Sequence, residues 1–178
     1  MSLDSTATRP MIPAGTYMVD PSRTTVRFAV KKLWGLVTVR GTFDVCDGTI
    51  VLADDPADSS VRVTMAPDSF ATGNQRRDQD VTGKHFLDVA AYPAMTFAST
   101  SVESDGSGWT IRGLLTTHGV TAPVTLRLVH GRTTADGCAF TATAVVDRTA
   151  FGVSRAVGFI GRELAATIEI GAKRTGGR

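Results

Sequence analysis

The sequence predicts an all-β protein whose strands form one small antiparallel barrel. Apolar and polar residues alternate with a period of two, which is typical of strands that bury one face. About eight or nine such runs follow one another, and short turns such as residues 105–108 and Asp136-Gly137 separate them. A single polar segment interrupts this alternation. Eight-stranded barrels of this size either fill their interior with side chains or hold one small ligand.

The alternating runs extend along almost the whole chain. Two of them, ending at Thr117 and beginning at Val124, predict a hairpin whose connection, residues 118–123, contains His118 at a barrel mouth. Small and aromatic residues are interleaved on the predicted inner faces, so a solid core and an elongated apolar tunnel both remain open. The inner-face residues are, in order, Val26, Phe28, Val30; Val37, Val39, Phe43, Val45; Val61, Val63, Met65; Met95, Phe97; Trp109, Ile111, Leu115; Val124, Leu126, Leu128; Phe140, Ala142, Ala144, Val146; and Leu164, Ala166, Ile168, Ile170.

Residues 70–92 are the segment without strand periodicity. Their polar run, residues 74–80, leads into Phe86, Leu87 and Val89, which favours one or two short helical turns that cap one end of the barrel. The domain is expected to span residues 14–174, with flexible tails at residues 1–13 and 175–178.

Composition excludes several classes of protein. The 178 residues fit one domain, and a hydrophobic fraction of 42% comes without the run of about 18 apolar residues that a spanning helix needs, so we expect no stable membrane insertion. The net charge of +2 is spread along the sequence, which does not favour a nucleic-acid partner. Cys46, Cys138, His85 and His130 lack metal-ligand spacing, so unpaired structural thiols and no metal or cofactor are expected. As written, the chain has no leader and would be cytoplasmic; a trimmed N-terminus would allow a secreted or periplasmic protein.

Several short motifs, in a fixed order, resemble those of the YceI-like polyisoprenoid-binding family over about residues 15–172. Each motif is weak alone, and their order and spacing make the resemblance specific. They are Val19-Asp20, Phe28, Val39-Arg40-Gly41, Phe43 and Gly48; then Arg77-Asp78, Phe86, Asp88-Val89, Tyr92-Pro93, Thr96-Phe97 and Ser99-Thr100; then Leu115-Thr116-Thr117-His118-Gly119-Val120-Thr121, Pro123-Val124-Thr125-Leu126, Arg148 and Phe151-Gly152-Val153.

The resemblance implies a lipocalin-like, extended eight-stranded antiparallel barrel with the helical insert near one mouth, commonly a homodimer. Its apolar pore would hold a long isoprenoid chain, such as a polyprenyl phosphate or an isoprenoid quinone, for transport or storage, and the protein would not be an enzyme. Where the family has an Arg-Asp-x-His-Leu motif, this chain has Asp80 in place of the histidine.

Two sets of candidate binding residues follow. The expected pore lining is Phe28, Trp34, Phe43, Phe97, Leu115, Phe140 and Phe159, each of which could equally fill a core. The expected contacts to a polar head group are Arg40, Arg77, Asp78, His118 and Arg148, because guanidinium and imidazole groups bind phosphate or carbonyl oxygens.

Some of these residues also have simpler structural interpretations. Arg77 and Asp78 could form an ion pair or cap the helical insert, and His118 could be a turn histidine bonded to the backbone. Two other functions also remain open: a small enzyme that acts on a lipophilic substrate with His118 and Asp78 as an acid–base pair, or a filled barrel that serves as an interaction module. The sequence contains no nucleophile elbow, phosphate-binding loop, dinucleotide fingerprint or zinc-protease motif.

Overall fold

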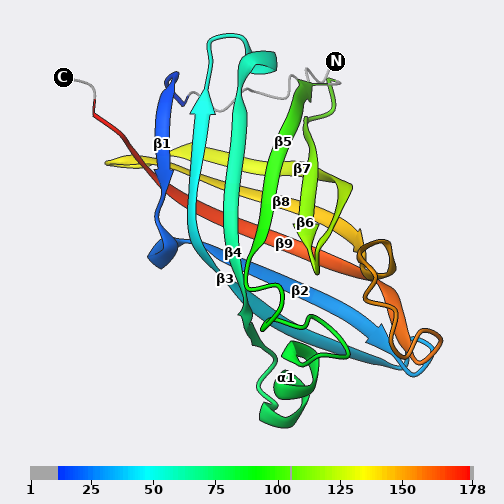
Figure 1. Ribbon diagram of the computed structural model, residues 1–178. Helices are drawn as coiled ribbons and strands as arrows, with labels where there is room; N and C mark the ends of the chain where they lie inside the picture. The colour runs from blue at the N-terminus through cyan, green and yellow to red at the C-terminus, as the bar shows by residue number, and fades with distance from the viewer. Residues whose placement is uncertain (1–11, 105, 177–178) are drawn as a thin grey trace.

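The computed structural model describes residues 12–104 and 106–176 as an antiparallel barrel (Figure 1). The strands follow the order β1-β3-β2-β9-β8-β7-β6-β5-β4, and a further pairing of β3 with β4 closes the ring from β3 round to β4. The predicted all-β barrel is thereby confirmed. The strands are β1 (Gly15–Val19), β2 (Thr25–Lys32), β3 (Val37–Leu52), β4 (Ser60–Ala71), β5 (Met95–Ser104), β6 (Trp109–Thr117), β7 (Val120–Thr133), β8 (Gly137–Asp147) and β9 (Ile160–Arg174).

Strands β1 and β2 together occupy one position of the barrel wall. Both pair with β3 and with β9, β1 at one end of these strands and β2 along the rest. A short 3₁₀ turn, Pro21–Arg23, separates them and is capped by the carboxylate of Asp20, which accepts hydrogen bonds from the Ser22 amide and hydroxyl. The cap pairs a backbone amide where the chain bends between β1 and β2, so the barrel wall stays continuous there.

Strands β6 and β7 form the predicted hairpin, with a shorter connection than expected. Thr117 pairs with Val120, so the turn consists of His118 and Gly119 alone, at φ angles of 53° and 70°. Positive φ at both central positions is the geometry of a type I′ turn, which matches the twist of the flanking strands. Pro123, expected in the connection, lies within β7 opposite Leu114.

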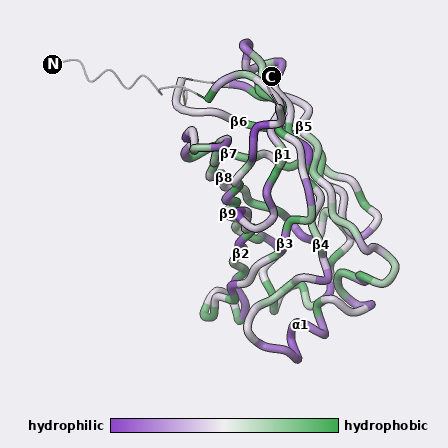
Figure 2. The backbone as a smooth tube through the Cα atoms, turned by 90° about the vertical axis from the view of Figure 1, so that its left-hand side faces the viewer, coloured by the Kyte–Doolittle hydropathy of each residue, from purple (hydrophilic) through white to green (hydrophobic). Residues whose placement is uncertain are grey.

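The predicted helical insert is confirmed and lies at one end of the barrel. Helix α1 (Gln75–Thr82) begins after Asn74, whose side chain accepts a hydrogen bond from the Arg77 amide, and turns follow it as far as β5. The tube is mainly hydrophilic along α1 (Figure 2). Figure 1 shows α1 towards the same end as the β2–β3 hairpin and the β8–β9 connection. We call this end the mouth.

Inward and outward residues alternate along the strands as the pattern predicts. The buried core includes residues from every strand, among them Phe28, Phe97 and Ala144. Of the two free cysteines, Cys138 is buried and Cys46 lies exposed, so only Cys138 has the expected structural position. The tails fall mostly outside the described residues; Ile12, expected in the first tail, is buried.

Candidate functional site: an apolar lumen with a polar mouth

The interior of the barrel contains a cavity of about 410 Å³, within the range of small-molecule sites. Its walls are mainly apolar side chains from the inner faces of β2 to β9, and residues of the insert and the β8–β9 connection line it at the mouth. The interior is therefore hollow, and the filled-core alternative does not describe it. Representative lining residues are Val30, Val63, Met95, Leu126, Leu164 and Ile168.

A second cavity, of about 120 Å³, continues the lumen towards the opposite end. Val61, Leu126, Ile168 and Ile170 line both cavities, so the two adjoin. Along β9 the lining extends from Ile160 to Ile170, a rise of about 33 Å in extended strand and roughly 25 Å along the axis of a barrel with strands tilted by about 40°. A lumen of this shape accommodates a chain better than a compact ligand.

Six of the seven residues expected to line the pore do face the lumen. Phe28, Phe43, Phe97, Leu115 and Phe159 line the larger cavity, and Phe140 lines the smaller one. Contact of these residues with a ligand remains a prediction. Trp34 differs from its expectation, because it lies in the β2–β3 turn with 83% of its surface exposed and lines neither cavity. The hairpin ends before the alternation of β2 can place it inside.

An aromatic cluster forms part of the wall nearest α1. Phe70 stacks on Phe28 with ring centroids 5.1 Å apart, and Phe43 meets Phe28 and Phe70 at 5.4 and 5.5 Å. The sequence pattern missed Phe70 as a lining residue, because it was assigned to the segment without strand periodicity, whereas β4 continues to Ala71. A period-two pattern continued from Val63 and Met65 would place Phe70 on the outer face; the irregular pairing of β4 with β3 between Ala66 and Ala71 changes that phase, and the sequence gives no local signal for it.

Arg77 and Asp78 at the mouth converge on Thr72 and do not pair with each other. The Arg77 Nε donates to the Thr72 hydroxyl at 2.8 Å, and the Asp78 carboxylate accepts from the Thr72 amide and hydroxyl. Arg77 lines the cavity and Asp78 does not. The Asp78 contacts fix the start of α1 against the end of β4, while the side chain that caps the helix is that of Asn74.

His118 lies in the β6–β7 turn, outside the cavity lining. Its Nδ1 lies 3.1 Å from the backbone oxygen of Phe151, and its ring packs edge-on against Tyr92 with centroids 5.0 Å apart. These contacts join the turn to the β8–β9 connection and to the insert. The histidine thus has the structural position of a turn residue bonded to the backbone, with Asp78 engaged elsewhere.

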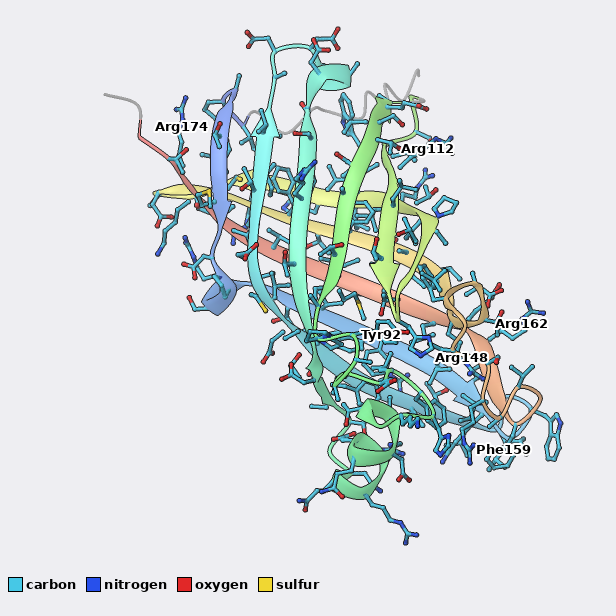
Figure 3. The ribbon with its side chains drawn as sticks, in the orientation of Figure 1. Tyr92, Arg112, Arg148, Phe159, Arg162 and Arg174 are labelled. Atoms are coloured by element: carbon cyan, nitrogen blue, oxygen red, sulfur yellow. The ribbon has the colours of Figure 1, made fainter. Side chains whose placement is uncertain are left out.

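Arg148 is a buried cation at the mouth, with 8% of its surface exposed. Its Nε donates to the carbonyl of Gly161 at 2.9 Å and its Nη2 to that of Ile160 at 3.0 Å, while Nη1 donates to the carbonyls of Val153 and Arg155 at 2.8 and 2.9 Å. Burial lowers the pKa of this guanidinium from its ordinary value. The side chain lines the cavity, yet most of its donors hold the β8–β9 connection in place (Figure 3).

Arg40 does not fit its expected role, and two other charged residues take positions at the mouth. Arg40 is exposed on β3, on the face opposite to that of its buried neighbour Val39, and it lines neither cavity. Lys32 and Asp80 line the larger cavity, although the pore assignment did not include them. Lys32 ends β2 in phase with Phe28 and Val30, so the inward alternation carried one step further was the available signal.

These features define a class: a closed, lipocalin-like antiparallel barrel with an apolar lumen and charged groups at one mouth. The model of the YceI-like domain family matches residues 17–172, and the chain belongs to that family. A UPF0312 protein of Yersinia pestis (strain Pestoides F) is 38% identical over 116 residues, which are 64% of this chain and 60% of that protein. A UPF0312 protein of Enterobacter sp. (strain 638) is 39% identical over the same shares.

Solved structures show the same fold. Burkholderia cenocepacia BcnA is similar with a TM-score of 0.73 and 22% identity, covering 85% of this chain and 98% of BcnA. A polyisoprenoid binding domain from Saccharophagus degradans, implicated in plant cell wall breakdown, has a TM-score of 0.65 and 14% identity, covering 92% of this chain and 100% of that domain. Across the described residues, none of the helices has the length and apolar character required to span a bilayer.

Proposed function

We propose that this protein binds a long-chain isoprenoid lipid, such as a polyprenyl phosphate or an isoprenoid quinone, in the lumen and carries or stores it unchanged. The observation that carries the proposal is the pair of adjoining apolar cavities that follow the barrel axis. Membership of the YceI-like family supports a lipid-binding role, and one structural neighbour is described as a polyisoprenoid binding domain.

The energetics favour a ligand of several isoprene units. Burial stabilises a ligand by about 0.8 kcal/mol per CH₂, or about 4 kcal/mol for a five-carbon unit. Association costs on the order of 4–15 kcal/mol in lost freedom, so about three or four buried units are needed before binding is tight. A lumen of roughly 25 Å is long enough for an extended chain of that size.

The polar head of the ligand would lie at the mouth against Lys32 and Arg77. Both side chains line the cavity, and within the described residues only the Nε of Arg77 is engaged, by Thr72. We expect Arg77→Met to weaken binding of a polyprenyl phosphate about tenfold and to leave binding of the corresponding polyprenyl alcohol unchanged, because only the phosphate makes charged hydrogen bonds. Arg40→Met, on the outer face of β3, is the control. Equal losses for both lipids would contradict this head-group assignment.

The contacts of the acid–base candidates favour a carrier over an enzyme. His118 is held by the Phe151 carbonyl and by Tyr92, while Asp78 is held by Thr72. A general base and its orienting carboxylate need to share a hydrogen bond. These two groups instead make separate contacts, His118 with the β8–β9 connection and Asp78 with the end of β4.

The test is native mass spectrometry of the purified protein, followed by organic extraction and identification of the bound lipid. Ala144 is buried and lines the cavity, so Ala144→Phe places a ring in the lumen. Val145, the next residue of β8, is 62% exposed, which makes Val145→Phe a matched control on the outer face. We expect the bound lipid to be lost from Ala144→Phe and retained in Val145→Phe.

Two results would overturn the proposal. One is a protein that is empty after purification and does not take up added prenyl lipids; the other is lipid retained equally by both variants when each is folded by circular dichroism. The same spectra give the mass of the assembly and so test the homodimer that the family resemblance predicts.

A further inference from the structure

The mouth carries an unusual group of exposed apolar side chains. In the β2–β3 turn, Trp34 and Leu36 are each 83% exposed. In the β8–β9 connection, Val157 is 50% exposed and Phe159 48%. We call these four residues the apolar rim. Large apolar side chains that gather on one surface, rather than scatter singly, indicate an interaction site.

The two segments of the rim are joined to each other and to the lumen. The Leu33 amide donates to the Phe159 carbonyl at 2.9 Å, and Lys32 pairs with Ile160. Phe159 and Lys32 also line the larger cavity, so the rim is continuous with the lumen entrance. Figure 3 shows Phe159 at the same end of the barrel as Arg148 and Arg162.

The backbone at the tip of the hairpin is strained in a way that exposes the tryptophan. Leu33 and Trp34 have φ angles of 51° and 54°, and the Gly35 amide donates to the Lys32 carbonyl at 3.2 Å. A type I′ turn of this kind favours Asn-Gly, and bulky residues at positive φ are outliers. Burial within the monomer does not explain Trp34, because 83% of its surface is exposed. Strain of this kind is typical of functional sites.

Charge around the rim has one sign. Residues 21–43 and 148–162 contain no Asp or Glu, and Lys31, Lys32 and Arg155 flank the apolar side chains. Arg162, at the end of the second segment, is paired with Asp147 at 3.2 Å.

Two other charged segments differ from the rim, although the far end also has basic residues at the ends of strands, such as Arg132 and Arg174. The insert, residues 72–94, is balanced, with Arg76, Arg77 and Lys84 against Asp78, Asp80 and Asp88. At the opposite end of the barrel, the β3–β4 connection, residues 53–59, has Asp54, Asp55 and Asp58 and no basic residue. The barrel therefore presents a basic, apolar rim at the mouth and an acidic loop at the far end.

We propose that the apolar rim docks reversibly on an anionic lipid bilayer, with Trp34, Leu36 and Phe159 in the interface and Lys31, Lys32 and Arg155 on the anionic head groups. Tryptophan is enriched at membrane interfaces, and each basic residue near an anionic surface contributes to the attraction. The acidic loop orients the barrel with its entrance towards the bilayer. This inference rests on the proposed function for its purpose, since docking at the entrance lets a lipid chain pass between bilayer and lumen without crossing water.

Vesicle binding tests the proposal directly. The full chain with Trp109→Phe, which leaves Trp34 as the only tryptophan, is mixed with vesicles of phosphatidylcholine alone or of equimolar phosphatidylcholine and phosphatidylglycerol. We expect sedimentation with the anionic vesicles, a blue shift of the Trp34 emission, and release in high salt. Lys31→Ala and Lys32→Ala should each lower partitioning about fivefold. Trp34→Ala, in the wild-type background, should lower it about tenfold.

Matched controls lie away from the mouth. Val129→Ala removes an apolar side chain that is 63% exposed on β7, and Arg132→Ala removes a basic residue towards the opposite end of that strand; neither should change partitioning. Absence of vesicle binding, equal binding to neutral vesicles, or equal losses in rim and control variants overturns the docking proposal. Lipid extraction from the wild-type protein separates this result from the proposed function, because Trp109 lines the smaller cavity. If the protein contains lipid but does not bind vesicles, the docking proposal alone is refuted. If it binds vesicles but does not take up lipid, the carrier proposal alone is refuted.

Discussion

Replacement of Arg148 by methionine should release the β8–β9 connection from the barrel. The guanidinium donates four hydrogen bonds to backbone carbonyls, between Val153 and Gly161, at 2.8–3.0 Å. Hydrogen bonds to charged groups contribute about 1.5–3 kcal/mol each, so four give at least about 6 kcal/mol. Several kcal/mol of desolvation of the buried cation offset part of this gain. We therefore expect Arg148→Met to lower the free energy of unfolding by about 3 kcal/mol.

The assay combines urea denaturation with hydrogen exchange of the backbone amides. Loss of the four bonds should also remove protection from the Leu33 amide, because its acceptor, the Phe159 carbonyl, lies in the released segment. Arg162→Met is the matched control: that side chain is 62% exposed and its one ion pair, with Asp147, should contribute less than about 1 kcal/mol. An Arg148→Met protein with unchanged unfolding free energy and unchanged exchange would refute the reasoning.

Three further predictions concern stability in acid, the buried indole N–H of Trp109 and the reactivity of the two cysteine thiols. The hydrogen bond from Ser22 holds the pKa of Asp20 below its ordinary 3.8. The ionised Asp20 carboxylate therefore stabilises the folded protein above about pH 4, and this stabilisation is lost on further acidification. Asp20→Asn should flatten the decline of unfolding free energy between pH 5 and pH 3, measured by urea titration; an unchanged slope contradicts it. Among the described residues the buried Trp109 indole N–H has no hydrogen-bond partner, so Trp109→Phe should not lower the melting temperature, and a clear decrease would be the contrary result. Burial raises the pKa of Cys138 to about 11 while Cys46 is exposed, so Ellman's reagent at pH 8 should modify one thiol rapidly and the second only in denaturant; two rapid reactions would contradict this.

Local patterns were sufficient to predict the strands and their inward faces, but not the closure of the ring. The two-residue period places Phe28, Phe97 and Leu126 on inner faces whatever the partner strand, because side chains alternate across any strand. The ring closure through β3 and β4 is a long-range pairing that no local pattern encodes. It could be expected only from the number of strands and from the family resemblance.

The site was predicted less well at the mouth, because turns and connections decide its geometry. Trp34 was expected inside, but it lies in the turn of residues 33–36 that joins the paired residues Lys32 and Val37, and the positive φ angles of this turn place it outside. Arg40 carries the positive charge expected of a head-group contact, but it lies on the outer face of β3. Arg148 lies where it was expected to lie, near the cavity, yet most of its donors are used by backbone carbonyls that a sequence cannot assign to it.

The hollow interior, which the sequence left undecided, follows from where glycines face aromatic rings. A Cβ atom added at Gly113 would lie 2.4 Å from the Phe97 ring, and one at Gly41 would lie 2.5 Å from the ring of Phe28, its cross-strand partner. Each ring therefore occupies the space that a side chain on the neighbouring strand would have taken. A ring whose tip rests on a glycine of the neighbouring strand lies partly along the wall, which leaves more of the lumen free. A barrel rich in phenylalanine can in this way keep an apolar interior cavity, and the glycines opposite the phenylalanines are as much part of the cavity wall as the rings.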